Sequence, residues 1–210
     1  MGNLITFVAV EEKERDIVLA ASGIFMQYGI KSVNMDDVAK HLSISKKTLY
    51  KYVKDKNDLL SKGMRLHMAA EDSAIAEILA KNLNAIDENL EIMTLILSML
   101  QNLHPSIMFD LEKYHPALMK EMLDSRHKLM HQCVLENLKR GKEEGFYRQN
   151  LNEEILTSFY INSVDMILDI APVHIKGASF TERYSEFFRY HIRGIASEKG
   201  VEYLKTKVKL

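Results

Sequence analysis

Apolar side chains recur every three to four residues along most of this chain, which is the period of an α-helix. Between residues 11 and 28 the recurring positions include Ile17, Ala21 and Ile24. Gly29 then stands where a helix commonly ends. Strand-like alternation with β-branched residues is missing from the chain. The pattern therefore predicts an all-α protein whose first clear helix covers residues 11–28.

Three helix starts follow close together, each marked by a residue suited to capping. Asn34 has Asp37 three positions further on, which is the spacing of a capping box. Ser45 is the second capping residue, and Asp55 is the third. We expect the helices that they start to cover residues 35–42, 46–53 and 56–79.

The rest of the chain also has a helical period, and its three prolines stand at the joints between elements. Proline is tolerated at a helix start or just beyond a helix end, because it lacks the amide hydrogen that a helix interior needs. We expect further helices over residues 85–103, 106–113, 116–144, 152–170 and 181–197.

The composition is that of a folded protein with a substantial core. The 210 residues are 47% hydrophobic and include only 9 Gly and 3 Pro, so long uninterrupted elements are expected. The single cysteine, Cys133, cannot form an internal disulfide, which favours a cytoplasmic setting. The apolar stretch over residues 4–10 is too short for a membrane span or a signal peptide, and we expect residues 1–10 to form a flexible tail.

Positive charge is concentrated in residues 40–62, which hold seven lysines against two aspartates, although the formal net charge of the chain is -1. The segment MDDVAKHLSISKKTLYKYV has the layout of a helix-turn-helix. Ala39 is the small residue that lets the two helices approach, and Leu49 is among the apolar residues that would face their core. The turn holds Ser43 where glycine is usual, which implies strain of about 1 kcal/mol.

If Leu49 points inward, the opposite face of its helix carries Lys47, Tyr50, Lys51 and Lys54. Lysine can contact phosphates or guanine edges, and a tyrosine hydroxyl can bind a phosphate. A basic face that is merely solvated is the other interpretation. The caps, the small residue at the crossing and the inward apolar set favour DNA binding.

Residues 29–60, GIKSVNMDDVAKHLSISKKTLYKYVKDKNDLL, resemble the DNA-binding region of the TetR family of bacterial transcriptional regulators. The resemblance implies an N-terminal three-helix DNA-binding domain over residues 11–55 and a larger helical effector-binding and dimerisation domain over residues 56–210. It implies that Thr48, Tyr50 and Lys56 contact phosphates, and that Lys46, Lys47 and Lys51 lie near base edges. The candidate DNA-binding residues are Asn34, Ser45, Lys46, Lys47, Thr48, Tyr50, Lys51, Tyr52 and Lys56.

The same resemblance implies a dimeric repressor that binds a palindromic operator and is released by a ligand. The central helices, residues 85–144, would enclose the effector pocket, and their methionines suit a largely apolar small molecule. Ordinary core filling explains these methionines equally well. The candidate pocket residues are Met93, Met99, Phe109, Tyr114, His115, Met119, Met122 and Met130.

The last two predicted helices would form the homodimer interface, because a two-fold operator calls for a two-fold protein. Their aromatic residues recur at helical spacing, a pattern that also fits an intramolecular core. The candidate interface residues are Ile155, Phe159, Asn162, Met166, Tyr184, Phe187, Phe188 and His191.

Catalytic and metal-binding interpretations lack the residues that they require. His127 and His131 lie four apart on one predicted helix, but no third ligand can be named, so no metal is expected. No nucleophile elbow, phosphate loop or dinucleotide glycine pattern occurs, and we expect neither an enzyme nor a cofactor. The remaining alternative is a helical interaction module whose basic segment binds an acidic partner without sequence specificity.

Overall fold

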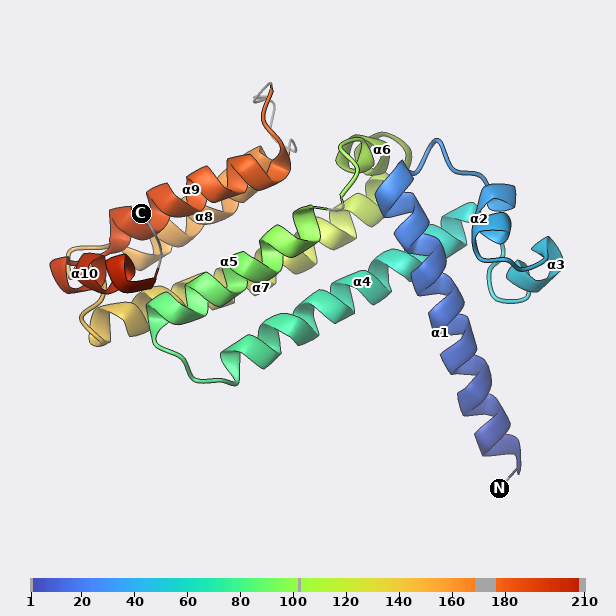
Figure 1. Ribbon diagram of the computed structural model, residues 1–210, viewed down its shortest axis with the longest axis horizontal. Coiled ribbons are helices and arrows are strands. Elements are labelled where there is room, and N and C mark those ends of the chain that lie inside the picture. Colours follow the sequence, from blue (N-terminus) through green and yellow to red (C-terminus); the bar gives the residue numbers. More distant parts are fainter. Residues whose placement is uncertain (1, 102, 169–176, 208–210) are drawn as a thin grey trace. The chain divides into compact units, whose positions relative to one another are not determined.

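The computed structural model describes residues 2–101, 103–168 and 177–207, with side chains described from residue 12 onward. Apart from one isolated bridge between Tyr147 and Ala196, the described residues form helices and their connections, which confirms the all-α prediction. The helices are α1 (Gly2–Tyr28), α2 (Met35–His41), α3 (Lys46–Leu49), α4 (Lys56–Leu79), α5 (Ala85–Leu100), α6 (Ile107–Tyr114), α7 (Pro116–Glu143), α8 (Glu153–Ile167), α9 (Phe180–Ile195) and α10 (Glu198–Lys207) (Figure 1).

The chain divides into two compact units, described separately below. The first unit comprises Met1–Ser73 and Asn102–Met119, and the second comprises Ala74–Gln101 and Lys120–Leu210. No helix within the described part of the chain is long and apolar enough to span a membrane.

In the first unit, α1 crosses α4 at very close range. A Cβ added to Gly63 of α4 would lie 2.3 Å from Cβ of Ser22 on α1, so only glycine fits there. The buried Ser22 hydroxyl donates to the Leu19 carbonyl and lies 2.8 Å from Nε2 of His67. Burial lowers the pKa of the His67 imidazole. This crossing fixes α4 against α1 and thereby supports the small helices that follow α1.

The core of the second unit joins residues from α5, α7, α9 and α10. Tyr147, just after α7, is almost fully buried, and its hydroxyl donates to the Ala85 carbonyl at 3.0 Å. A Cβ added to Gly141 would lie 2.0 Å from the Tyr147 ring, so the tyrosine seats only over glycine. The buried carboxylate of Glu88 is neutralised by Arg140, 2.6 Å away.

Several helix boundaries differ from the predictions. The first helix begins at Gly2 instead of following a tail of ten residues, because no glycine or proline interrupts residues 3–22 and extending an existing helix costs little. The predicted helix over residues 46–53 closes after Leu49 and continues as turns. Helix α10 was missed, since Gly200 weakens its helical signal. The predicted end of the 152–170 helix lies partly outside the described residues.

Candidate DNA-binding surface

Helix α2 starts with the predicted capping box. The Asn34 side chain accepts hydrogen bonds from the amides of Asp36 and Asp37, at 2.8 and 3.0 Å. The Asn34 amide in turn donates to Oδ2 of Asp37 at 2.9 Å. The otherwise unpaired amides of the first turn are thereby satisfied, which fixes where α2 begins.

The turn after α2 has the conformation that the sequence predicts. Ser43 has a φ of +53°, in the left-handed region that favours glycine. The Ile44 amide closes the turn on the Ala39 carbonyl at 3.0 Å, and Ala39 itself is buried. The chain can therefore reverse within three residues and bring α3 against α2.

Helix α3 is one turn long and is held by its cap and by one buried anchor. The Ser45 hydroxyl accepts from the Thr48 amide at 3.0 Å, which confirms Ser45 as the cap. Leu49 is fully buried, and Tyr52 is half-buried. Because Leu49 faces the core, the opposite side of the segment must face solvent.

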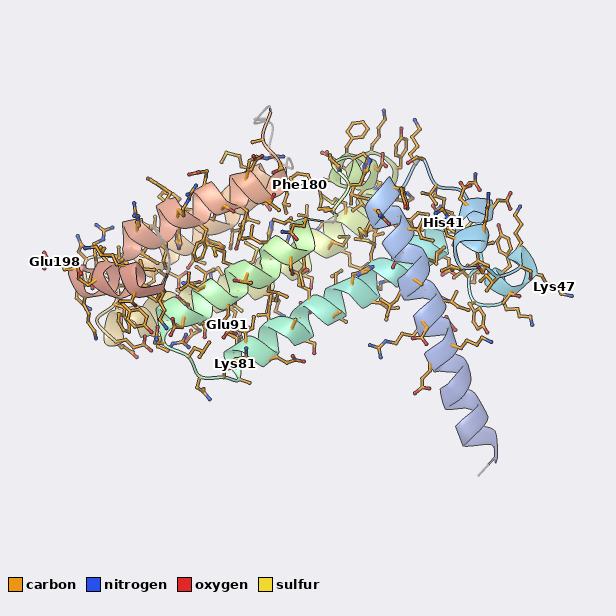
Figure 2. All side chains as sticks on the ribbon, viewed as in Figure 1. His41, Lys47, Lys81, Glu91, Phe180 and Glu198 are labelled. Atoms are coloured by element: carbon orange, nitrogen blue, oxygen red, sulfur yellow. The ribbon has the colours of Figure 1, made fainter. Side chains whose placement is uncertain are left out.

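The solvent-facing side carries the basic residues. Lys47, Lys51 and Lys54 are exposed, and 46% of Tyr50 is exposed. Figure 2 shows Lys47 extending away from the ribbon of α3. Thr48 is half-buried and its hydroxyl lies 2.8 Å from that of Ser45. The predicted phase of the helix is therefore the observed one.

Two predicted DNA-contacting lysines have partners of their own. Lys46 forms an ion pair with Asp36 of α2. Nζ of Lys56 donates to the Val33 carbonyl at 2.5 Å and lies 5.5 Å from the centre of the Phe25 ring. Burial lowers the pKa of Lys56, against the opposing influence of Asp110 and Asp37. The Lys56 ammonium therefore does not belong to the exposed basic face, and it would have to leave Val33 to reach a phosphate.

Helix α6 holds the loop between α1 and α2, a contact that the sequence analysis missed. The Lys31 amide donates to Oδ2 of Asp110 at 3.1 Å, and the His104 amide donates to the Met26 carbonyl at 2.8 Å. Asp110 is buried among the apolar residues of α6. A carboxylate within the apolar run IMFDL was the available signal, since buried carboxylates need donors.

The candidate effector residues do not form one site within either unit. Met93, Met99, Met122 and Met130 belong to the second unit, whereas Phe109, Tyr114, His115 and Met119 belong to the first. Met119 is buried, and Phe109 is 56% exposed with Nζ of Lys113 5.2 Å from its ring centre. Burial lowers the pKa of His115, and neighbouring Lys56 lowers it further. The candidate set is therefore divided between the two units, and Met119 is its one buried member.

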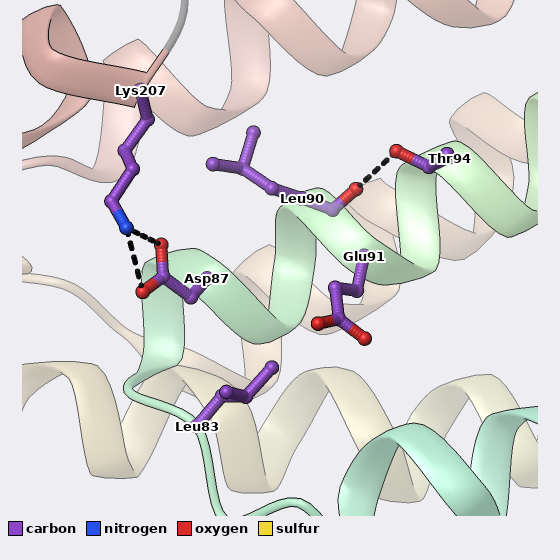
Figure 3. A pocket seen from close by; sticks show the side chains of 6 residues that line it. All are labelled: Leu83, Asp87, Leu90, Glu91, Thr94 and Lys207. Atoms are coloured by element: carbon purple, nitrogen blue, oxygen red, sulfur yellow. Dashed lines mark hydrogen bonds and ion pairs between the residues drawn. The ribbon is translucent and has the colours of Figure 1, made fainter.

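One open pocket of about 500 Å³ lies in the second unit, beside the first turns of α5 (Figure 3). None of the candidate effector residues lines it. Its wall contains the ion pair between Lys207 and Asp87, at 3.2 Å. The lining residues are Leu83, Asp87, Leu90, Glu91, Thr94 and Lys207.

The candidate interface residues separate into two groups. On α8, Ile155 is 52% exposed, Phe159 is 63% exposed and Asn162 is exposed, while Met166 is half-buried. On α9, Tyr184 and Phe188 are buried, so assigning them to a surface was wrong. Their side of α9 packs within the second unit, because α9 contacts both α5 and α8.

The buried side of α9 forms an aromatic cluster with Tyr160 of α8. The Tyr160 and Tyr184 hydroxyls lie 3.1 Å apart, and His191 meets the Tyr160 ring edge-on at 4.9 Å between ring centres. Phe187 is half-buried and also contacts Tyr160, 5.1 Å between ring centres. Burial lowers the pKa of His191 to about 4. His191 is half-buried, and its imidazole is therefore neutral near pH 7.

Tyr190 of α9 was not predicted, although it is the most exposed large apolar residue of this helix at 81%. Each of the two histidines weighed as metal ligands lies beside a carboxylate. His127 lies 3.0 Å from Asp165, and His131 lies 3.4 Å from Glu154. No cluster of three or more metal-ligating side chains is found among the described residues.

Comparisons with known proteins agree with this geometry. Residues 17–62 match the family described as "Bacterial regulatory proteins, tetR family". No significant match to a curated protein is found.

Solved structures share the fold over most of the chain. A TetR-family regulator from Agrobacterium tumefaciens has a TM-score of 0.68 at 14% identity, covering 89% of this chain and 99% of its own. A regulator from Saccharomonospora viridis, solved in complex with choline, has a TM-score of 0.65 at 16% identity, covering 90% and 100%. A ketosteroid transcriptional regulator of Mycobacterium tuberculosis has a TM-score of 0.60 at 14% identity, covering 89% and 96%.

The matched residues 17–62 contain the capped, basic helix-turn-helix described above, and the similar folds extend through the helices that follow it. Residues 17–62 therefore match the TetR family of bacterial regulatory proteins, and the chain shares its fold with solved regulators of that family.

Proposed function

We propose that this regulator is a homodimeric repressor that binds a palindromic operator and is released by a small, largely apolar ligand. The observation that carries the proposal is the exposed face of Lys47, Tyr50, Lys51 and Lys54, held in phase by the Ser45 cap and the buried Leu49. A basic face on a short capped helix suits the major groove, where lysines reach phosphates and guanine edges.

The exposed apolar residues of α8 support a homodimer. Ile155 and Phe159 lie four residues apart and share one face of α8, with Asn162 at the next turn. Large apolar side chains on a shared face mark interaction surfaces when they are contiguous. A second copy would also place a second α3 on the DNA, which one short helix needs because it reads only a few base pairs.

The side chains of α5 support an apolar effector. Ile92, Met93, Leu95 and Ile96 all remain half-exposed instead of being buried, although α5 is rich in apolar residues. Apolar surface that the helix leaves partly open can be covered by a ligand. The choline complex and the ketosteroid regulator among the similar folds are consistent with small-molecule control. We assign DNA binding to residues 11–55, and effector binding and dimerisation to residues 56–210.

Selection of bound fragments from the genomic DNA of the source organism tests DNA recognition. The full chain should retain fragments with a two-fold repeat, and a duplex bearing that repeat should outcompete a random duplex of equal length at fixed salt. Lys47→Gln should weaken operator binding by about 1 kcal/mol or more, the scale of one lost base or phosphate contact. The matched control is Lys128→Gln, an exposed lysine of α7 in the second unit, which should leave binding unchanged.

Equal retention of all polyanions, with no preferred sequence, would instead support the interaction-module alternative.

Release by ligand is tested separately, by measuring operator affinity with and without each candidate compound. A true effector should lower operator affinity by about 5- to 150-fold, the usual range of allosteric coupling. Unchanged affinity would rule out that compound.

A further inference from the structure

Two consecutive aspartates at the start of α2 have different tasks. Asp37 completes the capping box by accepting the Asn34 amide at 2.9 Å. Asp36 contributes only its backbone amide to the cap, at 2.8 Å from Oδ1 of Asn34. Its carboxylate instead reaches from α2 to α3 and pairs with Lys46 (Figure 2 shows α2 and α3 with their side chains). The cap therefore does not explain the carboxylate of Asp36.

The ion pair stands at the edge of the basic face. Its two side chains are 64% and 53% exposed, for Asp36 and Lys46 respectively. Within the part of the chain that the structure describes, no carboxylate is paired with the ammonium groups of Lys47, Lys51 or Lys54. Lys46 is thus the lysine of α3 whose charge is locally cancelled, while its neighbours are available to any phosphate.

An exposed pair of this kind is easily exchanged. Such pairs contribute only about 0–1 kcal/mol in water, so Lys46 can leave Asp36 when a better acceptor is present. For the Lys46 ammonium, a phosphate offers the same non-directional electrostatic attraction as the Asp36 carboxylate. The negative charge of Asp36 also repels that phosphate. The acceptor edge of a guanine, at the right position in the groove, adds directed hydrogen bonds without a full negative charge beside Asp36.

We propose that Asp36 is a specificity-determining residue, which withholds Lys46 from the phosphates of random DNA and releases it to a base edge of the operator. The inference rests on the proposed DNA-binding function. Binding to random DNA is almost wholly electrostatic, so pairing Lys46 with Asp36 weakens it. Operator binding loses little, because Lys46 is released to a base edge of the operator. The carboxylate thereby widens the gap between operator and random DNA.

The test compares Asp36→Asn with the wild-type chain on the selected operator duplex and on a random duplex of equal length, over a series of salt concentrations. Freeing Lys46 should raise the affinity for random DNA about three- to fivefold near 0.1 M salt and steepen its salt dependence by about 0.9, the contribution of one extra phosphate contact. Operator affinity should rise by less than about twofold, so the specificity ratio falls.

Two controls separate this role from a general change in charge. Asp72→Asn changes the net charge equally at an exposed site about 24 Å along α4 from its first residue, and it should alter neither ratio nor salt dependence. In a Lys46→Gln background, Asp36→Asn should no longer steepen the salt dependence for random DNA. Thermal melting of each variant checks that α2 remains folded.

The outcomes distinguish the inference from the function on which it rests. Equal gains on both duplexes, gains that persist without Lys46, or no gain on random DNA would each overturn the role of Asp36. A wild-type chain that already fails to prefer the operator would overturn the proposed function instead. A lower specificity ratio that depends on Lys46 would support both.

Discussion

The α2–α3 segment and the α8–α9 pair have equally regular side-chain patterns, yet only the first pattern identifies a solvent-facing side. In α3, two lysines precede one apolar anchor, Leu49, and the observed phase follows the prediction. In α9, the aromatic positions fit both a core and an interface, and Tyr184 and Phe188 prove to be core. A charged residue in the sequence indicates a position exposed to water, because burying a charge is costly. An apolar residue indicates only that its side chain tends to be covered, and both its own core and a partner could cover it.

The largest expected difference in stability is between replacing a buried aromatic residue of α9 and replacing an exposed aromatic residue of α8. Phe188→Ala should lower the free energy of unfolding by about 3–5 kcal/mol, because it leaves a cavity in the core. Phe159→Ala should cost less than about 1 kcal/mol in the monomer, since its ring is mostly exposed. Denaturant unfolding at several protein concentrations provides the measurement.

Concentration dependence sharpens this first comparison. The loss caused by Phe188→Ala should not depend on protein concentration, whereas the effect of Phe159→Ala should grow with it if a second copy covers α8. Sedimentation should then show Phe159→Ala dissociating at a higher concentration than the wild type. A dimer that tolerates Phe159→Lys without dissociating would contradict the proposed interface.

Acid should weaken the second unit through His191. The pKa of this half-buried imidazole is about 4 in the folded chain, compared with about 6.5 when unfolded. As the pH falls from 6.5 to 4, the unfolded state takes up a proton that the folded state does not, so folding loses up to about 3 kcal/mol. His191→Gln should remove this part of the acid sensitivity, measured as the difference in unfolding free energy between pH 7 and pH 4.5. An unchanged acid response would show that the pKa of His191 is not lowered in the folded chain.

The local contacts of the helix-turn-helix should have smaller effects on stability. Ser45→Ala leaves the Thr48 amide without its partner and should cost about 1 kcal/mol, the usual contribution of a capping side chain. Ser73→Ala, at an exposed helical position, is the matched control and should be near neutral. Thermal melting distinguishes the two, and equal melting temperatures would mean that the cap does not set the start of α3.

Lys47 should have the smallest effect on stability, although we propose that it has a large effect on DNA affinity. Lys47→Gln should change the free energy of unfolding by less than about 0.5 kcal/mol, because the side chain projects into solvent. A substantial loss of stability would place Lys47 in a structural contact and would weaken its assignment to the reading face.

Local rules predicted much of the first unit and of its candidate site. The caps at Asn34 and Ser45, the left-handed Ser43 and the inward Leu49 all depend on residues within four positions of one another. Contacts of that range can be derived from the sequence, since helix geometry fixes which neighbours meet.

Longer-range partners could not be derived in this way. The sequence gives no indication that Lys56 donates to Val33, 23 positions earlier, or that Asp110 accepts from the Lys31 amide, 79 positions earlier. The sorting of aromatic residues into a buried set around Tyr160 and an exposed set around Phe159 was also invisible. Each of these depends on how helices from distant parts of the chain pack.

The sequence by itself determined where the helices of the helix-turn-helix begin, which side of α3 meets water and which family motif it carries. Only the tertiary structure decided which lysines have partners within the protein, which aromatic rings belong to the core, and which loop α6 contacts. The physical reason is that capping and helical phase depend on residues a few positions apart in the sequence. Burial and ion pairing depend on which distant elements pack against each other in the folded chain.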